Sequence, residues 1–125
     1  MLINPTKLIL DLRKVSLDKA PADVFRCLNH AAEALASKDF TTVELQFRGK
    51  PKFLLEGSYF KTLGQEYELQ NPVYTIRTFP ENVKNMDGTA AFSSWSGGML
   101  GVLQKQMEDF LEFNKQWYVN ELSEQ

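Results

Sequence analysis

Three short stretches of the chain are expected to form β-strands, and in the first two hydrophobic and polar residues alternate, which is the pattern of half-buried strands. Residues 7–13 place three leucines on one side, and residues 42–48 do the same with a valine, a leucine and a phenylalanine. Residues 52–56 form the third stretch, after a glycine and a proline that favour a turn. The second and third stretches therefore predict a β-hairpin.

Two further stretches carry apolar residues at the spacing of an α-helix. The first begins at Pro21, a residue suited to the first helical turn. Its apolar positions fall on one stripe, formed by Val24, Phe25, Leu28, Ala31, Ala32, Leu35 and Ala36. The second helix follows Gly57 and is shorter, because Gly64 is expected to interrupt or end it.

The last third of the chain predicts one more strand and one long helix. Residues 73–79 lie between two prolines that start and end a fourth strand. Residues 81–98 are irregular and rich in glycine and aromatic side chains. A long apolar helix then runs from about Met99 to Leu122.

This order of elements predicts a two-layer α+β fold. The first six elements match the split βαββαβ, ferredoxin-like order, and the long C-terminal helix follows them. Another small antiparallel α+β sandwich with the same elements remains an alternative. Since no linker, repeat or low-complexity tract divides the chain, we expect residues 1–125 to form a single domain.

The apolar side of the final helix is wider than one packing contact requires. Its apolar residues cover roughly 200°, whereas a helix packed on one surface needs about 100°. One explanation is burial between the sheet and loops of the same chain. The other is a homodimer in which Leu111, Tyr118 and Leu122 contact a second copy.

Composition narrows the classes of partner. The net charge of −2 gives no general attraction to nucleic acid or anionic lipid, and no apolar run reaches membrane-spanning length. The basic and aromatic residues 47–53 lack the pattern of an RNA-binding motif, so nucleic acid is disfavoured. The single cysteine, Cys27, favours a reducing compartment, and we expect a soluble cytoplasmic protein.

Metal and cofactor chemistry has little support in the residue pattern. His30 is the only histidine and is predicted on the outer side of the first helix. Cys27 is expected to be semi-buried on the flank of the apolar stripe, where it pairs with no metal ligand at a usual spacing. No metal site and no cofactor are expected.

The candidate site lies in the loop before the final helix. Ser96, Gly97 and Gly98 are a possible cradle for a phosphate or carboxylate at the helix N-terminus, although an ordinary serine cap is the simpler interpretation. Phe92 and Trp95 are candidate apolar walls.

Arg77 in the predicted fourth strand is the natural partner for an anion. A solvent-facing arginine paired with an acid is the alternative.

Two functions follow from these features. The first is a small binding or regulatory module that associates with itself through the C-terminal helix. The second is a binding protein or enzyme for a small anionic ligand, with a pocket between strand 73–79 and loop 81–98. No motif identifies a catalysed reaction, so enzymatic activity stays open.

Overall fold

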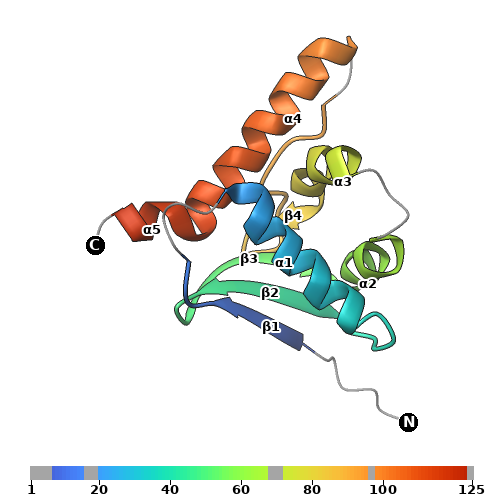
Figure 1. The fold of residues 1–125 in the computed structure, drawn as a ribbon, viewed down its shortest axis with the longest axis vertical. Coiled ribbons are helices and arrows are strands. Elements are labelled where there is room, and N and C mark those ends of the chain that lie inside the picture. The colour runs from blue at the N-terminus through green and yellow to red at the C-terminus, as the bar shows by residue number, and fades with distance from the viewer. Residues whose placement is uncertain (1–6, 16–19, 68–71, 96–97, 124–125) are drawn as a thin grey trace.

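The computed structural model describes residues 7–15, 20–67, 72–95 and 98–123 (Figure 1). It confirms the predicted α+β class, with a four-stranded mixed sheet and a long C-terminal helix. The elements are β1 (Lys7–Leu12), α1 (Pro21–Ala34), β2 (Thr42–Phe47), β3 (Lys50–Glu56), α2 (Gly57–Glu66), α3 (Pro72–Thr78), the 3₁₀ segment η1 (Phe79–Asn82), β4 (Val83–Lys84), α4 (Met99–Asn114), the π-helical segment η2 (Lys115–Val119) and α5 (Asn120–Ser123).

The strands lie in the order β1-β2-β3-β4. β1 pairs in parallel with β2, and α1 connects these two adjacent strands. β2 and β3 form the predicted antiparallel hairpin, and β3 also pairs with β4. In a split βαβ unit another strand separates the two parallel strands. Here they are direct neighbours, so the ferredoxin-like order is not confirmed.

The predicted strand at residues 73–79 is wrong, because these residues form α3 and the start of η1. Pro72 occupies the first turn of α3, where a missing N–H is tolerated. One turn apart, Ile76 and Phe79 both pack on the core, which is a helical spacing. The fourth strand is only Val83–Lys84, within the stretch expected to be irregular.

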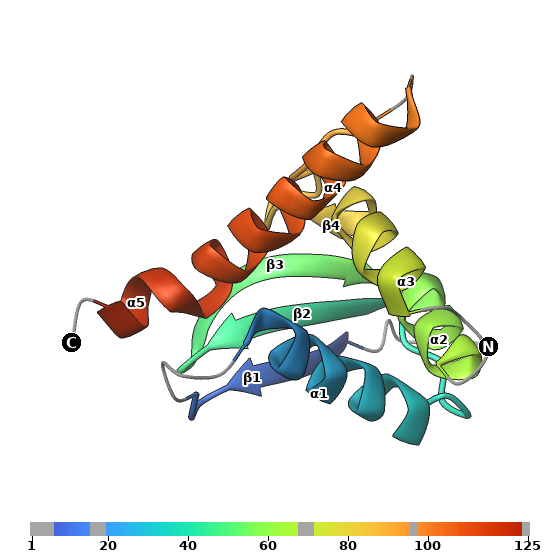
Figure 2. The same ribbon diagram turned by 45° about the horizontal axis from the view of Figure 1, so that its top comes forward.

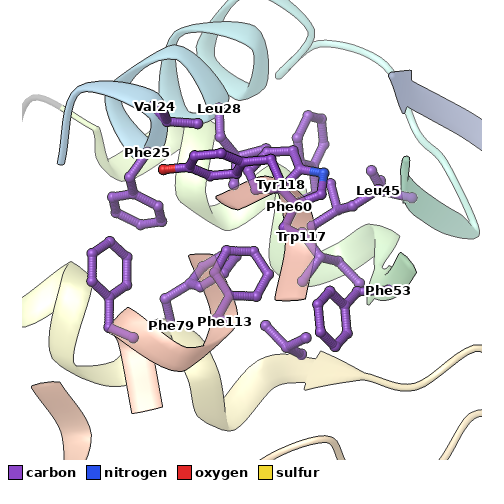
Figure 3. Packing of buried hydrophobic residues seen from close by; sticks show 14 of the residues in the cluster. Val24, Phe25, Leu28, Leu45, Phe53, Phe60, Phe79, Phe113, Trp117 and Tyr118 are labelled. Atoms are coloured by element: carbon purple, nitrogen blue, oxygen red, sulfur yellow. The ribbon is translucent and has the colours of Figure 1, made fainter. Parts of the chain in front are cut away.

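The core lies between one face of the sheet and the helices. On β2 its residues are the three predicted ones, Val43, Leu45 and Phe47, and all are fully buried. The predicted stripe of α1 packs above them through Val24, Phe25, Leu28 and Ala32. Aromatic rings from several elements complete the cluster (Figure 3). Burial of this apolar surface is the main driving force for the fold.

Gly64 does not end α2, contrary to the prediction. The helix continues to Glu66, and Gly64 is buried against α1. A Cβ atom at this position would lie 2.1 Å from the carbonyl oxygen of Ala32. Glycine is therefore required here by the close approach of two helices.

The final helix follows the predicted course but changes its winding near the end. Figure 2 shows the N-terminal end of α4 running beyond the sheet. At η2 the helix widens to π-helical hydrogen bonding, and both Trp117 and Tyr118 are buried there. Tyr118 and Leu122 thus belong to the core of their own chain, whereas Leu111 is 49% exposed. Burial within one chain explains much of the wide apolar arc.

Tyr118 places a hydroxyl group in this core. Its oxygen has no hydrogen-bond partner among the described residues, and the side chain packs against Trp117 with ring centroids 5.8 Å apart (Figure 3). Burial raises the pKa of the phenol to about 12, because the charged form loses its hydration.

Replacing Gly64 with alanine should destabilise the protein by roughly 1–3 kcal/mol, since the new methyl group meets backbone atoms that cannot move aside easily. Gly101 is the matched control: it lies in α4, and a Cβ atom there would meet no other part of the described chain within 4 Å. Gly101→Ala should stabilise by about 0.5–1 kcal/mol. Urea unfolding of both variants measures the difference, and stabilisation by both would contradict the helix contact.

Replacing Tyr118 with phenylalanine should stabilise the protein by about 1 kcal/mol near neutral pH, because an unsatisfied buried hydroxyl is removed. The gain should grow in alkali. The pKa of Tyr118 is raised in the folded state, so folding favours the neutral phenol. The stability of the folded state is therefore unaffected by this group below pH of about 10 and falls as the pH rises towards about 12. That loss amounts to roughly 2–3 kcal/mol in the wild type and is absent in the variant. Urea unfolding at neutral and alkaline pH tests this, and parallel pH profiles would contradict it.

Candidate functional site

Arg77 links two helices in the structure. It lies near the end of α3, and its Nε donates a hydrogen bond of 2.9 Å to Oε1 of Gln106 on α4. Gln106 is buried, and its Nε2 donates to Oε1 of Glu81 at 3.3 Å. This chain of polar groups ties α3 and η1 to α4.

Trp95 lies along α4. Its indole Nε1 donates a hydrogen bond of 2.7 Å to Oδ2 of Asp109. The ammonium group of Lys105 sits 4.7 Å from the centre of the ring, within the range of a cation–π contact. Lys105 and Asp109 are one helical turn apart, so the tryptophan is held by one face of α4.

Phe92 lies beside β3. It is half-buried, and its ring centroid lies 6.4 Å from that of Phe53 on β3. Arg77 and Trp95 therefore both contact α4 within about one helical turn, whereas Phe92 lies near β3. Each of the three has a partner that gives it a structural role. Their part in ligand binding stays a prediction.

The glycine-rich end of the loop is described only at Gly98. This residue precedes α4, and its carbonyl oxygen accepts a hydrogen bond of 3.0 Å from the Val102 N–H. Ser96 and Gly97 lie outside the described residues.

A pocket of about 440 Å³ lies elsewhere, between α1, α2, α3 and η1. Its size is that of cavities that hold small organic molecules. The residues that line it are Ala22, Phe25, Arg26, Asn29, Tyr59, Thr62, Leu63, Glu66, Tyr67, Thr75, Ile76, Thr78, Glu81 and Asn82. Apolar and aromatic side chains thus alternate with amide, hydroxyl and charged groups.

Asn29 is the buried polar residue of this pocket. Its Nδ2 donates a hydrogen bond of 2.8 Å to the carbonyl oxygen of Phe25, one turn earlier in α1. The amide oxygen is then left to accept a hydrogen bond from another donor. Phe25 lies beside it in the lining, so an acceptor and an aromatic ring are presented together.

Among the described residues, the charged side chains that line the pocket are Arg26, Glu66 and Glu81. Arg26 is exposed and lies 3.6 Å from the carboxylate of Asp23 in the same helix. The two carboxylates and one guanidinium of the described lining sum to a formal charge of −1. This balance favours a neutral or cationic ligand over an anion.

His30 and Tyr67 form a pair next to the pocket. His30 is exposed, as predicted, and its Nε2 lies 3.0 Å from the hydroxyl oxygen of Tyr67. The rings meet edge to face, with centroids 4.8 Å apart. Since Tyr67 also lines the pocket, this contact fixes one side of it.

The described residues also bear on the predictions about Cys27, metal binding and membrane-spanning helices. Cys27 is exposed, so its predicted semi-buried position is wrong. In the described ranges, no three His, Cys, Asp or Glu side chains gather closely enough to hold a metal ion. The helices of the same ranges are too short or too polar to span a bilayer.

The sequence pattern contained one signal for the pocket that the prediction did not use. Asn29 falls four residues after Phe25 and three before Ala32, within the apolar stripe of α1. A polar residue at such a position must be satisfied internally or face a polar cavity.

Comparison with protein-family models, with curated proteins and with solved structures finds no match to this chain. Its function must therefore be argued from its own geometry.

Replacing Arg77 with methionine should destabilise the protein by roughly 1–3 kcal/mol, because the buried Gln106 oxygen loses its donor. Arg26→Met removes an exposed ion pair and should change stability by less than about 0.5 kcal/mol. Urea unfolding followed by tryptophan fluorescence compares the two. Equal, small effects would contradict a structural role for Arg77.

Proposed function

We propose that this protein is a binding module for a small organic molecule, which it holds in the pocket between α1, α2 and α3. The observation that carries the proposal is the pocket of about 440 Å³, in which aromatic walls and a buried amide face the same space. Ligand sites in proteins combine a mainly apolar surface with a few well-placed polar groups.

The lining indicates the chemistry of the ligand. Phe25, Tyr59 and Leu63 suit an apolar or aromatic body. The amide oxygen of Asn29 and the carboxylate of Glu81 suit hydrogen-bond donors, such as a hydroxyl group or an amine. The ligand class is therefore neutral or cationic, in contrast to the anion expected near Arg77.

Self-association through the C-terminal helix stays a prediction. Of the three side chains that motivated contact through the final helix, Tyr118 and Leu122 are buried in their own chain. Leu111 remains exposed, as does Leu100 near the start of α4, but nothing in the structure says what covers them.

Ligands that share one ring but differ in charge test the proposal. Benzylamine, benzyl alcohol and benzoate are titrated into the ¹⁵N-labelled protein, and amide chemical shifts are followed. The amine and the alcohol should bind with a Kd of about 1 mM or weaker, as expected for so few atoms, and shift amides of α1, α2 and α3. Benzoate should bind several times more weakly, because its charge meets two carboxylates.

Two buried asparagines provide a matched pair of variants. Asn114 on α4 makes the same bond as Asn29, from its Nδ2 to a carbonyl oxygen one turn earlier, but it does not line the pocket. Asn29→Leu should weaken benzylamine binding, and Asn114→Leu should leave it unchanged. Absence of saturable shifts around the pocket with all three ligands, or equal effects of the two variants, would contradict the proposal.

A further inference from the structure

Among the described residues, the outer edge of β1 has backbone groups that pair with no other strand. β1 is the first strand in the order β1-β2-β3-β4, and β2 is its single strand neighbour in the part of the chain that the structure describes (Figure 1). An edge of six residues without proline or glycine is a template for another strand.

One hydrogen bond shows which residues of β1 face outward. The Arg48 N–H donates to the carbonyl oxygen of Leu12 at 2.9 Å, so the backbone groups of Leu12 point toward β2. Backbone direction alternates along a strand, so Leu8 and Leu10 also point inward. The backbone groups of Lys7, Ile9 and Asp11 therefore point to the free edge.

The sequence of β1, Lys-Leu-Ile-Leu-Asp-Leu, is complementary to itself when two copies run antiparallel. With Ile9 opposite Ile9 of the second copy, Lys7 lies opposite Asp11 at both ends of the pairing. We propose that two copies of this chain associate through β1 in this register, with a twofold axis at Ile9. The outward-facing residues would then exchange about six backbone hydrogen bonds.

The burial of side chains on both faces of β1 supports a second strand beside it. On the core face, Leu8 and Leu10 are only half-buried, whereas their partners Val43 and Leu45 on β2 are fully buried. Pairing brings Leu8 next to Leu10 of the second copy and covers both. On the open face, Ile9 is 50% exposed and gains the other Ile9 as a neighbour.

The charges of Lys7 and Asp11 favour a second copy of this chain, rather than an unrelated strand, as the partner of β1. The Lys7 side chain is half-exposed and lies 2.6 Å from the carboxylate of Glu44, which is nearly buried. Asp11 is held in place by the Gly49 N–H at 3.0 Å and by Arg13 at 2.8 Å. In the dimer each Lys7 lies between its own Glu44 and Asp11 of the second copy, and directly opposed charges of opposite sign stabilise strand pairs.

Sedimentation velocity over a range of concentrations tests the interface. The wild-type chain should form dimers, and Ile9→Lys should weaken dimerisation by at least about tenfold, because it opposes two lysines at the centre of the pairing. Since Ile9 is half-exposed in one chain, the variant should remain folded by circular dichroism. Leu111→Lys, on the exposed flank of α4, is the control and should leave dimerisation unchanged.

A cysteine at the twofold axis tests the register. In a Cys27→Ser background, Ile9→Cys places two thiols at opposed positions, where Cα atoms about 5.5 Å apart are compatible with a disulfide. Mild oxidation should link most chains of this variant. Lys7→Cys, whose partner position is Asp11, should not form the link.

These measurements decide the proposal. A wild-type chain that stays monomeric at several hundred micromolar overturns it. A dimer that Leu111→Lys weakens as much as Ile9→Lys, or one that Ile9→Cys does not link, also overturns it. None of these results bears on ligand binding, because the pocket contains no residue of β1.

Discussion

The packing of Phe79 is the interaction on which the arrangement of the helices depends. This fully buried ring lies 4.9 Å from Phe25 of α1, 5.0 Å from Phe113 of α4 and 6.1 Å from Tyr59 of α2, measured between centroids. Removing its ring from the centre would leave three helices without their common contact. Phe25 and Tyr59 also line the pocket, so the wall of the candidate site and the centre of the core are parts of one aromatic cluster.

The sequence predicted those elements whose periodicity is strong and local. β1, β2, α1 and the final helix all lie close to their expected positions, because each shows its pattern over several repeats, and β3 was expected from the turn residues before it. The predicted strand at residues 73–79 was wrong because prolines at both ends are compatible with a strand and with a helix. Their conformation is decided by the distant partners of Phe79, which local pattern does not reveal. The prediction that Gly64 interrupts or ends its helix was wrong for the same reason, since the residue it packs against, Ala32, is far away in the chain.

The candidate site was predictable only in part. Arg77 and Trp95 were predicted as ligand contacts, and that role stays a prediction. Their hydrogen-bond partners Gln106 and Asp109 lie on α4, whose placement could not be derived from the sequence pattern. The pocket lies between α1, α2, α3 and η1, and its lining combines residues separated by much of the chain. The one indication of the pocket in the sequence is Asn29, a polar residue on the apolar stripe of α1. The edge of β1 shows the opposite case, because its self-complementary pattern is visible in the sequence but becomes meaningful once the strand order is known.

The π-helical segment η2 determines which side chains of the last described residues face the sheet. A π-helical turn accommodates one residue more than an α-helical turn, so it rotates everything after it by about 100° relative to a regular helix. Trp117 is fixed within this segment by a hydrogen bond of 3.0 Å from its Nε1 to the Gln46 carbonyl oxygen. Beyond it, Leu122 points into the core and Glu121 forms ion pairs with Lys50 and Lys52 of β3. The one additional residue in this π-helical turn thus orients the last described residues so that they contact the sheet.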